Sequence, residues 1–201
     1  MAAYPAAQRQ TRSWFDAVLA LGLRVKDREA RAHNVRVARL CVHIGRQMSM
    51  SAPELRVLAR AGLMHDIGKI GIPDSVLLKH DALDESEWTL MRTHPELGLS
   101  LLDRVAQSSR EMLAVLYHHE RLDGSGYPYG LKAEGIPIEA RIVAVADTYD
   151  ALTSHRPYRG ARTDGEARRV LVEEARSRLD PRAVDALFTA LDLAATALAI
   201  A

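Results

Sequence analysis

The chain of 201 residues is poor in cysteine, in excess charge of either sign and in long apolar runs. Its single cysteine, Cys41, excludes a disulfide framework and a cysteine-ligated structural zinc. Lys and Arg number 27 and Asp and Glu 26, and this net charge of +1 gives no global attraction to a nucleic-acid polymer. No stretch approaches the roughly 18 apolar residues of a membrane span. We therefore expect a cytoplasmic protein without membrane insertion.

Hydrophobic residues make up 48% of the chain, which is enough for one domain of ordinary size with its own core. Apolar residues recur at helical spacing in nearly every segment, so we predict an all-α fold. An N-terminal helix within residues 1–26 would cap the core or dimerise, and residues 27–201 would form the main domain. The helices expected in that domain cover about 27–48, 51–66, 84–94, 96–105, 110–120, a segment from 137 that includes Asp147 and Asp150, 164–179 and 181–199.

The segment His65-Asp66-Ile67-Gly68-Lys69 combines an imidazole, a carboxylate and a cation within five residues. Imidazole and carboxylate together suit a divalent metal, and the carboxylate can bridge two ions. Lys69, about one helical turn further on, can meet a phosphate oxygen. The alternative is a helix C-terminus at which Gly68 adopts the left-handed conformation and His65 faces the negative end of the helix dipole.

Further nitrogen and carboxylate ligands follow at other predicted helix ends and buried positions. Glu29 and His33 are four residues apart and share one helix face, where they would otherwise form a surface pair. Pro95 restricts the residue before it, so we expect His94 to project from irregular backbone. His118 and His119 end a helix, where a dipole effect is the alternative. Asp147 interrupts an apolar helix, and a buried carboxylate is costly unless paired or metal-bound.

One long irregular segment, residues 121–130, contains three glycines and one proline. Glycines let backbone approach a ligand closely, and a long loop in a compact domain is usually functional or mobile. We therefore expect a functional or mobile loop whose backbone can approach a ligand.

The candidate ligands are nitrogen and oxygen donors: Glu29, His33, His65, Asp66, His94, His118, His119 and Asp147. Six to eight such ligands exceed the needs of one octahedral ion that also binds water, and they suggest two or three ions bridged by Asp66. Such a cluster lowers the pKa of a bridging water and stabilises both oxygens of an in-line phosphoryl displacement. The reaction class indicated is phosphoester hydrolysis.

The combined motifs resemble the HD superfamily of metal-dependent phosphohydrolases, and more closely its HD-GYP branch. They are His65-Asp66-Ile-Gly-Lys69, His94-Pro95, His118-His119-Glu120, Asp123-Gly-Ser-Gly-Tyr127-Pro128 and Asp147-Thr-Tyr-Asp150 through Arg156-Pro-Tyr-Arg159. The resemblance covers about residues 24–190. It implies an all-helical HD-domain bundle that hydrolyses cyclic di-GMP to pGpG, and possibly to GMP, through a metal-bridging hydroxide. It also implies two or three divalent ions, iron above all, with manganese or another ion as a substitute.

Carried onto this chain, the family's metal ligands fall on His33, His65, Asp66, His94, His118, His119 and Asp147. Glu29 matches the extra ligand of the three-metal members, although the usual Tyr-Thr-Gly run before His33 is replaced by Arg28-Glu29-Ala-Arg-Ala. Asp66 and Lys69 would act in catalysis. Lys69, Tyr127, Arg156 and Arg159 would contact the substrate.

Two alternatives stay open at this point. The chain could act on another nucleotide, such as hybrid cyclic GMP-AMP, or serve as a non-catalytic signalling module, although such modules generally lack several of the ligands retained here. Residues 1–26 are too few for a receiver or sensory domain, which leaves a stand-alone enzyme or an excised domain. We expect a homodimer formed through the first helix.

Overall fold

The computed structural model describes residues 28–79, 81–103, 108–155 and 160–200. The N-terminal helix expected within residues 1–26, and Arg156 and Arg159, lie outside these ranges. The described residues contain no strand, only an isolated bridge between Asp123 and Lys132, so the predicted all-α fold is confirmed. The α-helices are α2 (Arg28–Gln47), α3 (Ala52–Met64), α4 (Asp74–Leu77), α5 (Glu85–Met91), α6 (His94–Leu102), α7 (Ser109–Tyr117), α8 (Ile138–Thr153), α9 (Asp164–Glu174) and α10 (Pro181–Ile200). Two short 3-10 helices, η1 (Ile67–Gly71) and η2 (Ala133–Gly135), complete them.

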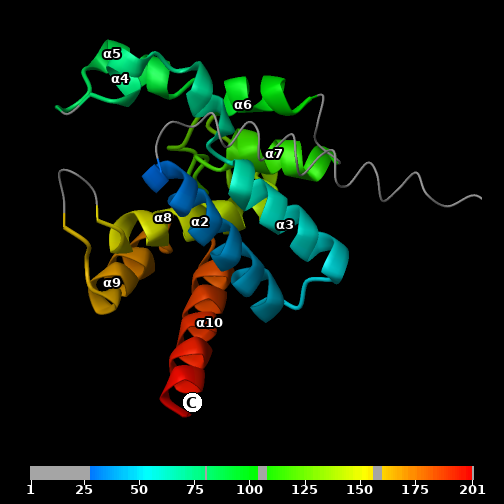
Figure 1. Cartoon of the computed structure of the whole chain (residues 1–201). Coiled ribbons are helices and arrows are strands. Elements are labelled where there is room, and N and C mark those ends of the chain that lie inside the picture. The colour runs from blue at the N-terminus through cyan, green and yellow to red at the C-terminus, as the bar shows by residue number, and fades with distance from the viewer. Residues whose placement is uncertain (1–27, 80, 104–107, 156–159, 201) are drawn as a thin grey trace, which may run out of the picture.

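Helix α8 is the central element, as its uninterrupted apolar run predicts. Residues Ile142 to Ala146 are all buried, so the helix has no solvent-facing side along this stretch. It packs against α2, α3, α7, α9 and α10 (Figure 1). A side chain on the next turn of α8 is therefore held at a fixed place beside these helices.

Helix α3 begins with the predicted capping box. The carboxylate of Glu54 accepts hydrogen bonds from the backbone N–H and the hydroxyl of Ser51, and Pro53 lies in the first turn. The helix packs along α2 and ends at Met64. His65 and Asp66 therefore leave the end of a helix that is fixed at both its start and its flank.

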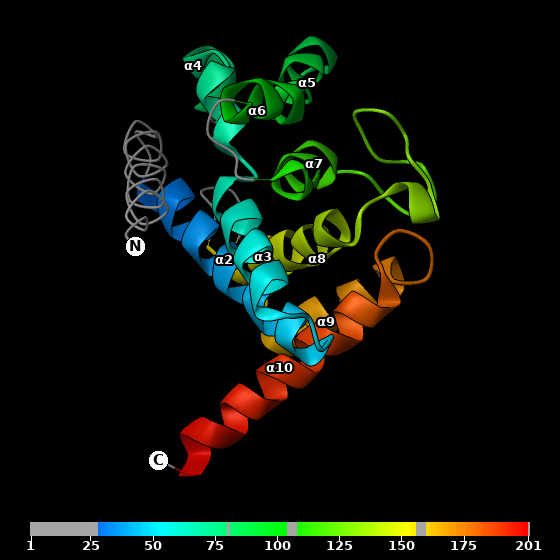
Figure 2. The same ribbon diagram turned by 90° about the vertical axis from the view of Figure 1, so that its right-hand side faces the viewer.

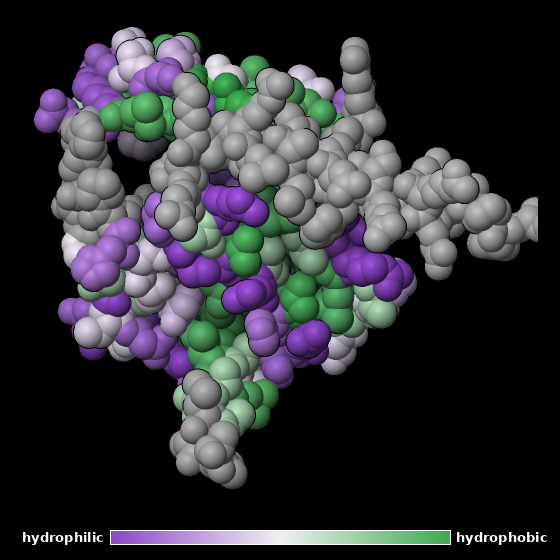
Figure 3. All heavy atoms as spheres, viewed as in Figure 1, coloured by the Kyte–Doolittle hydropathy of each residue, from purple (hydrophilic) through white to green (hydrophobic). Residues whose placement is uncertain are grey.

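Helices α4, α5 and α6 form a layer at one end of the molecule, and the C-terminal part of α10 projects from the other end (Figures 1 and 2). On the face seen in Figure 3, hydrophobic side chains lie among polar ones over α4 and α5. Trp88 and Leu90 of α5 are 46% and 45% exposed. Along the described ranges, none of the helices combines the length and apolar character that a membrane span requires.

Candidate metal centre

Three histidines at helix ends are oriented by the same device. In each ring Nδ1 donates to the backbone carbonyl three residues earlier, since a carbonyl can only accept. The pairs are His65 with Gly62 (2.9 Å), His94 with Met91 (2.8 Å) and His118 with Val115 (2.7 Å). This bond fixes the tautomer and leaves the lone pair of Nε2 available, as for metal-binding histidines.

The expectation that His94 projects from irregular backbone is wrong. His94 is the first residue of α6, and the break in the chain falls at Arg92 and Thr93. Pro95 is then the second helical residue, where the first turn tolerates a missing N–H, and the proline does not displace His94 from the helix. Its imidazole is 1% exposed because the α6 N-terminus packs against η1.

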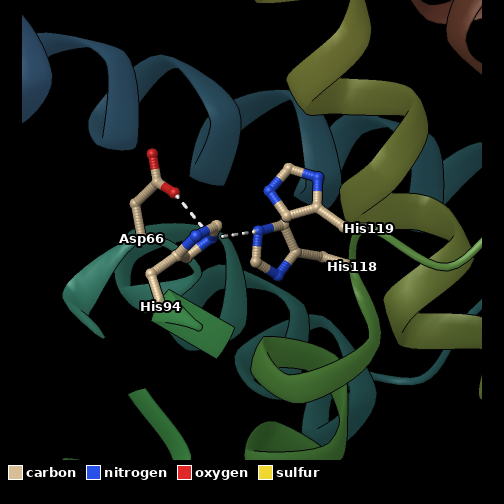
Figure 4. A group of neighbouring side chains, drawn as sticks. All are labelled: Asp66, His94, His118 and His119. Atoms are coloured by element: carbon tan, nitrogen blue, oxygen red, sulfur yellow. Dashed lines mark hydrogen bonds and ion pairs between the residues drawn. The ribbon is translucent and has the colours of Figure 1, made fainter. Parts of the chain in front are cut away.

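The predicted ligands converge into two groups that share Asp66. One contains His33 and His65, the other His94, His118 and His119, and within each group the ligand atoms lie within 4.8 Å of one another. The Oδ2 of Asp66 lies 3.4 Å from His65 Nε2 and 3.9 Å from His33 Nε2. Its Oδ1 lies 3.5 Å from His94 Nε2 (Figure 4). The two carboxylate oxygens thus face different histidine groups.

Asp147 adds a second carboxylate to this centre from the turn of α8 that follows the buried run. Its Oδ1 lies 3.3 Å from His33 Nε2 and 4.0 Å from His65 Nε2. Burial raises the pKa of the Asp147 carboxyl, but the hydrogen bond from His33 and the nearby His65 together lower it well below its ordinary value. An ionised, partly buried carboxylate of this kind is a ligand type that divalent ions prefer.

The residues fit a multinuclear metal site. His65 Nε2 is buried and has no hydrogen-bond partner among the described residues, which is rare for a buried polar atom. His94 Nε2 and His118 Nε2 face each other at 3.4 Å. An imidazole nitrogen oriented towards carboxylate oxygens and other imidazole nitrogens is satisfied by a cation between them, and the donor set of nitrogen and oxygen suits iron, manganese or zinc.

Burial keeps three of these histidines neutral. It lowers the pKa of His94, lowers that of His118 well below its ordinary value and lowers that of His119 to about 3. Neighbouring histidines lower the pKa of each further. A metal ion binds the neutral imidazole, so these rings need not lose a proton when the ion enters.

The carboxylate of Asp150, which is not among the site residues expected from the sequence, holds His33 in place. His33 Nδ1 donates to Asp150 Oδ2 at 2.7 Å, and Arg36 contacts the same carboxylate through Nε (2.7 Å) and Nη2 (3.1 Å). Ser154 also donates to it (3.2 Å). Asp150 lies three residues after Asp147 on α8, and this spacing was the available signal. The arrangement orients His33 Nε2 towards Asp147 and Asp66.

The glycine-rich loop is folded back onto the centre. Buried Glu120 accepts from the backbone N–H groups of Tyr129 (2.7 Å) and Leu131 (2.9 Å) and so closes the loop. A Cβ at Gly126 would collide with the backbone of residues 119–121. The Tyr127 ring stacks on His119, with centroids 4.6 Å apart, so the loop lies against a candidate ligand.

Gly68 is required for a reason different from the left-handed cap considered above. It lies inside η1 and is buried, and a Cβ there would collide with the carbonyl oxygen of His94. The positive-φ glycines lie instead at Gly124 and Gly130, in the loop. The close approach at Gly68 brings the segment bearing Asp66 against the N-terminus of α6, which bears His94.

Lys69 and Glu29 lie at the edges of the centre. The Lys69 ammonium contacts Asp66 Oδ2 at 2.6 Å. Glu29 is 62% exposed at its side chain, and its carboxylate accepts from Arg36 at 2.9 Å. The substrate role of Lys69 and the metal role of Glu29 stay predictions, as do the roles of Arg156 and Arg159.

Comparison with known sequences gives a match to the HD domain over residues 9–183. The cyclic di-GMP phosphodiesterase response regulator RpfG of Xanthomonas campestris is 44% identical over 171 residues, 84% of this chain and 45% of that protein. A cyclic di-GMP phosphodiesterase of Thermotoga maritima is 41% identical over 80% of this chain and 44% of its own length. A 3'3'-cGAMP-specific phosphodiesterase 2 of Vibrio cholerae is 38% identical over 84% and 33%. The chain spans less than half the length of these relatives.

Solved structures support the fold. Bd1817 of Bdellovibrio bacteriovorus, described as an HDG"Y"P protein, superposes with a TM-score of 0.68 at 19% identity, covering 90% of this chain and 64% of that one. The HD domain of the phosphodiesterase PgpH of L. monocytogenes, in complex with cyclic di-AMP, superposes with a TM-score of 0.65 at 15% identity, covering 90% and 96%. From the match over residues 9–183, together with its HD and GYP motifs, the chain belongs to the HD domain family, in its HD-GYP branch.

Proposed function

We propose that this chain is a metal-dependent phosphodiesterase that hydrolyses cyclic di-GMP to pGpG and possibly to GMP. The position of Asp66 carries the proposal, because its two carboxylate oxygens face two separate histidine groups within 4.0 Å. Relatives at 41–44% identity are named cyclic di-GMP phosphodiesterases. A partner-binding module has no need of such a ligand set, and this disfavours the non-catalytic alternative.

The ligands would be His33, His65, Asp66, His94, His118, His119 and Asp147. Divalent ions held there would supply hydroxide from water near neutral pH and neutralise charge on the phosphoryl oxygens. Lys69, beside Asp66, would bind the scissile phosphate or assist the leaving oxygen. Tyr127, on the loop over His119, would contact the phosphate or guanine, and Arg156 and Arg159 would bind outer parts of the substrate.

Two or three ions would load, with iron the first expectation and manganese or another divalent ion as a substitute. A third ion requires Glu29 as a ligand, and Glu29 must then leave its contact with Arg36. Replacement Glu29→Gln should therefore lower the metal content from three ions to two. An unchanged count in the variant would remove Glu29 from the ligand set.

Hybrid cyclic GMP-AMP is the second candidate substrate. Three relatives at 37–38% identity are named 3'3'-cGAMP-specific phosphodiesterases. The relatives of this chain therefore include enzymes named for cyclic di-GMP and enzymes named for 3'3'-cGAMP. The centre itself would act on either substrate, because it would engage the phosphodiester rather than the base. Discrimination between the two substrates must come from contacts to the bases, outside the metal centre.

Chromatography of products after incubation with each cyclic dinucleotide tests the proposal. Protein purified without oxygen should release pGpG or GMP from cyclic di-GMP faster than it opens the hybrid substrate. A metal-loaded protein that releases neither product would refute the proposed substrate class. We also propose a cytoplasmic homodimer, and light scattering that finds the same association state without residues 1–24 would refute dimerisation through the first helix.

A further inference from the structure

Arg92 lies beside the centre, at the junction of α5 and α6, and is exposed. Its guanidinium carbon is 5.9 Å from the ring centroid of Trp88 and 5.9 Å from that of Tyr127. These distances are at the limit of a cation–π contact with each ring. The two aromatic side chains therefore flank the guanidinium without enclosing it.

Tyr127 connects this cation to the candidate metal ligands. Its ring stacks on His119 at 4.6 Å and lies edge-on to His94 at 6.4 Å, measured between centroids. Arg92 and the histidine group therefore both neighbour the Tyr127 ring. A ligand a few ångströms longer than a single phosphate could reach both places.

Arg92 differs from the neighbouring cations, because each of those has a polar partner within the protein. Lys69 contacts the carboxylate of Asp66, and Arg121 donates to the carbonyl oxygens of His118 (3.2 Å) and Glu120 (3.0 Å). Arg92 forms no ion pair or hydrogen bond through its guanidinium with any residue in the described ranges. An exposed guanidinium flanked by two rings has its donor fork available for an anion.

We propose that Arg92 binds the second, non-scissile phosphodiester of a cyclic dinucleotide while the first phosphodiester lies at the metal centre. This inference rests on the proposed function. A cyclic dinucleotide has two phosphodiesters joined through its sugars, and when the first is bound the second either stays in water or meets a cation. Arg92 is then a substrate-binding residue that takes no part in bond breaking.

The test compares two diesters in the metal-loaded protein. Replacement Arg92→Met should raise KM for cyclic di-GMP about tenfold, with kcat changed less than about twofold, because one charge-assisted contact of ground and transition state is lost. Bis(p-nitrophenyl) phosphate has a single phosphodiester, so its kcat/KM should stay unchanged. Arg92→Lys should recover part of the lost affinity, and Arg39→Met, at an exposed arginine of α2, is the matched control.

Three results would overturn the proposal. The first is an unchanged KM for cyclic di-GMP in Arg92→Met, and the second is an equal loss with both diesters, which would indicate a general electrostatic or structural effect. The third is an equal loss in Arg39→Met. Failure of the proposed function is distinguishable: a protein that cleaves bis(p-nitrophenyl) phosphate but not cyclic di-GMP is then tested with hybrid cyclic GMP-AMP. Absence of calorimetric binding of both dinucleotides would end the subsite proposal as well.

Discussion

Two sets of acidic side chains, one buried and one partly buried, differ in their counter-charges. Glu111 and Glu139 are 0% and 3% exposed, and each contacts an arginine, Arg60 and Arg110 respectively. Asp66 and Asp147 lie among imidazole nitrogens instead. Among described lysines and arginines, the contact to these two aspartates is that of Lys69 with Asp66.

The difference separates structural from chemical use of such a charge. An arginine neutralises a carboxylate permanently and supplies several donors in a fixed geometry, which suits a pair that only stabilises the fold. His94, His118 and His119 stay neutral and supply lone pairs without a permanent charge, and the proton that His33 carries is one that an entering metal ion displaces. The first set should govern stability, and the second should govern metal binding.

The largest expected effect is that of Asp66→Ala. This change removes the oxygen ligands between the two histidine groups, so both metal loading and phosphodiester hydrolysis should be lost, with activity reduced by at least about a thousandfold. Metal analysis and product chromatography measure the two losses. Full activity in this variant would exclude a bridging role for Asp66.

Glu111→Gln should lower the stability of the protein and leave its metal content unchanged. The substitution replaces the buried carboxylate that Arg60 contacts with a neutral amide, and we expect the free energy of unfolding to fall by about 3 kcal/mol. Metal content per folded chain should stay the same. Denaturant unfolding in the presence of a chelator measures the first quantity, and a loss of metal without a loss of stability would erase the distinction between the two sets.

Asp150→Asn tests the outer carboxylate. The amide cannot hold His33 and Arg36 as the carboxylate does, so His33 Nε2 should be less well oriented and metal affinity should fall about 10- to 100-fold. Competition with a chelator of known affinity measures the change. Ser154→Ala, which removes one neutral hydrogen bond to the same carboxylate, is the milder control. Equal affinities in Asp150→Asn and the unchanged protein would show that His33 needs no support.

The smallest effect is a pH dependence of metal binding that originates at His33. Burial lowers its pKa, but the hydrogen bonds to Asp147 and Asp150 outweigh burial and raise it from 6.5 to about 9. A metal ion must displace this proton, so apparent affinity should rise up to about tenfold per pH unit from pH 7 towards 9. Calorimetry in buffers of different ionisation enthalpy should find about one proton released per chain at pH 7.

The raised pKa of His33 has the opposite effect on the stability of the metal-free protein, which decreases as the pH rises. Because the folded pKa lies above the unfolded value of 6.5, the contribution of His33 is complete below about pH 6.5 and is lost as the pH rises through about 9. Metal affinity that does not change between pH 7 and 9 would contradict the assigned protonation of His33.

The sequence predicts the ligands better than it predicts what orients them. His65-Asp66, His118-His119 and Asp147 could be found because ligand types recur at predicted helix ends and in an apolar run. The orienting contacts are tertiary: Arg36 and Asp150 are 114 residues apart, and their pairing with His33 depends on how α2 packs on α8. The spacing of Asp147 and Asp150 along α8 marks Asp150 as a candidate, but it does not reveal His33 or Arg36 as its partners.

The same reason explains two further differences. The restriction before a proline predicts irregular backbone at His94, but the first turn of a helix tolerates Pro95 and so includes His94. The sequence pattern allows Gly68 to be a helix stop, whereas the carbonyl of His94, from a different helix, excludes a side chain there. Arg92 gave no signal in the sequence, since its relation to Tyr127 exists only in the fold.

The most direct test of the account is the number of metal ions per chain in protein purified without oxygen, with the Asp66→Ala variant measured beside it. A site shared by two histidine groups predicts two or three iron or manganese ions per chain in the unchanged protein. In the Asp66→Ala variant, metal loading should be lost. One ion or none per chain, persisting after reconstitution with excess iron or manganese, would contradict the central claim that Asp66 joins two metal-binding groups.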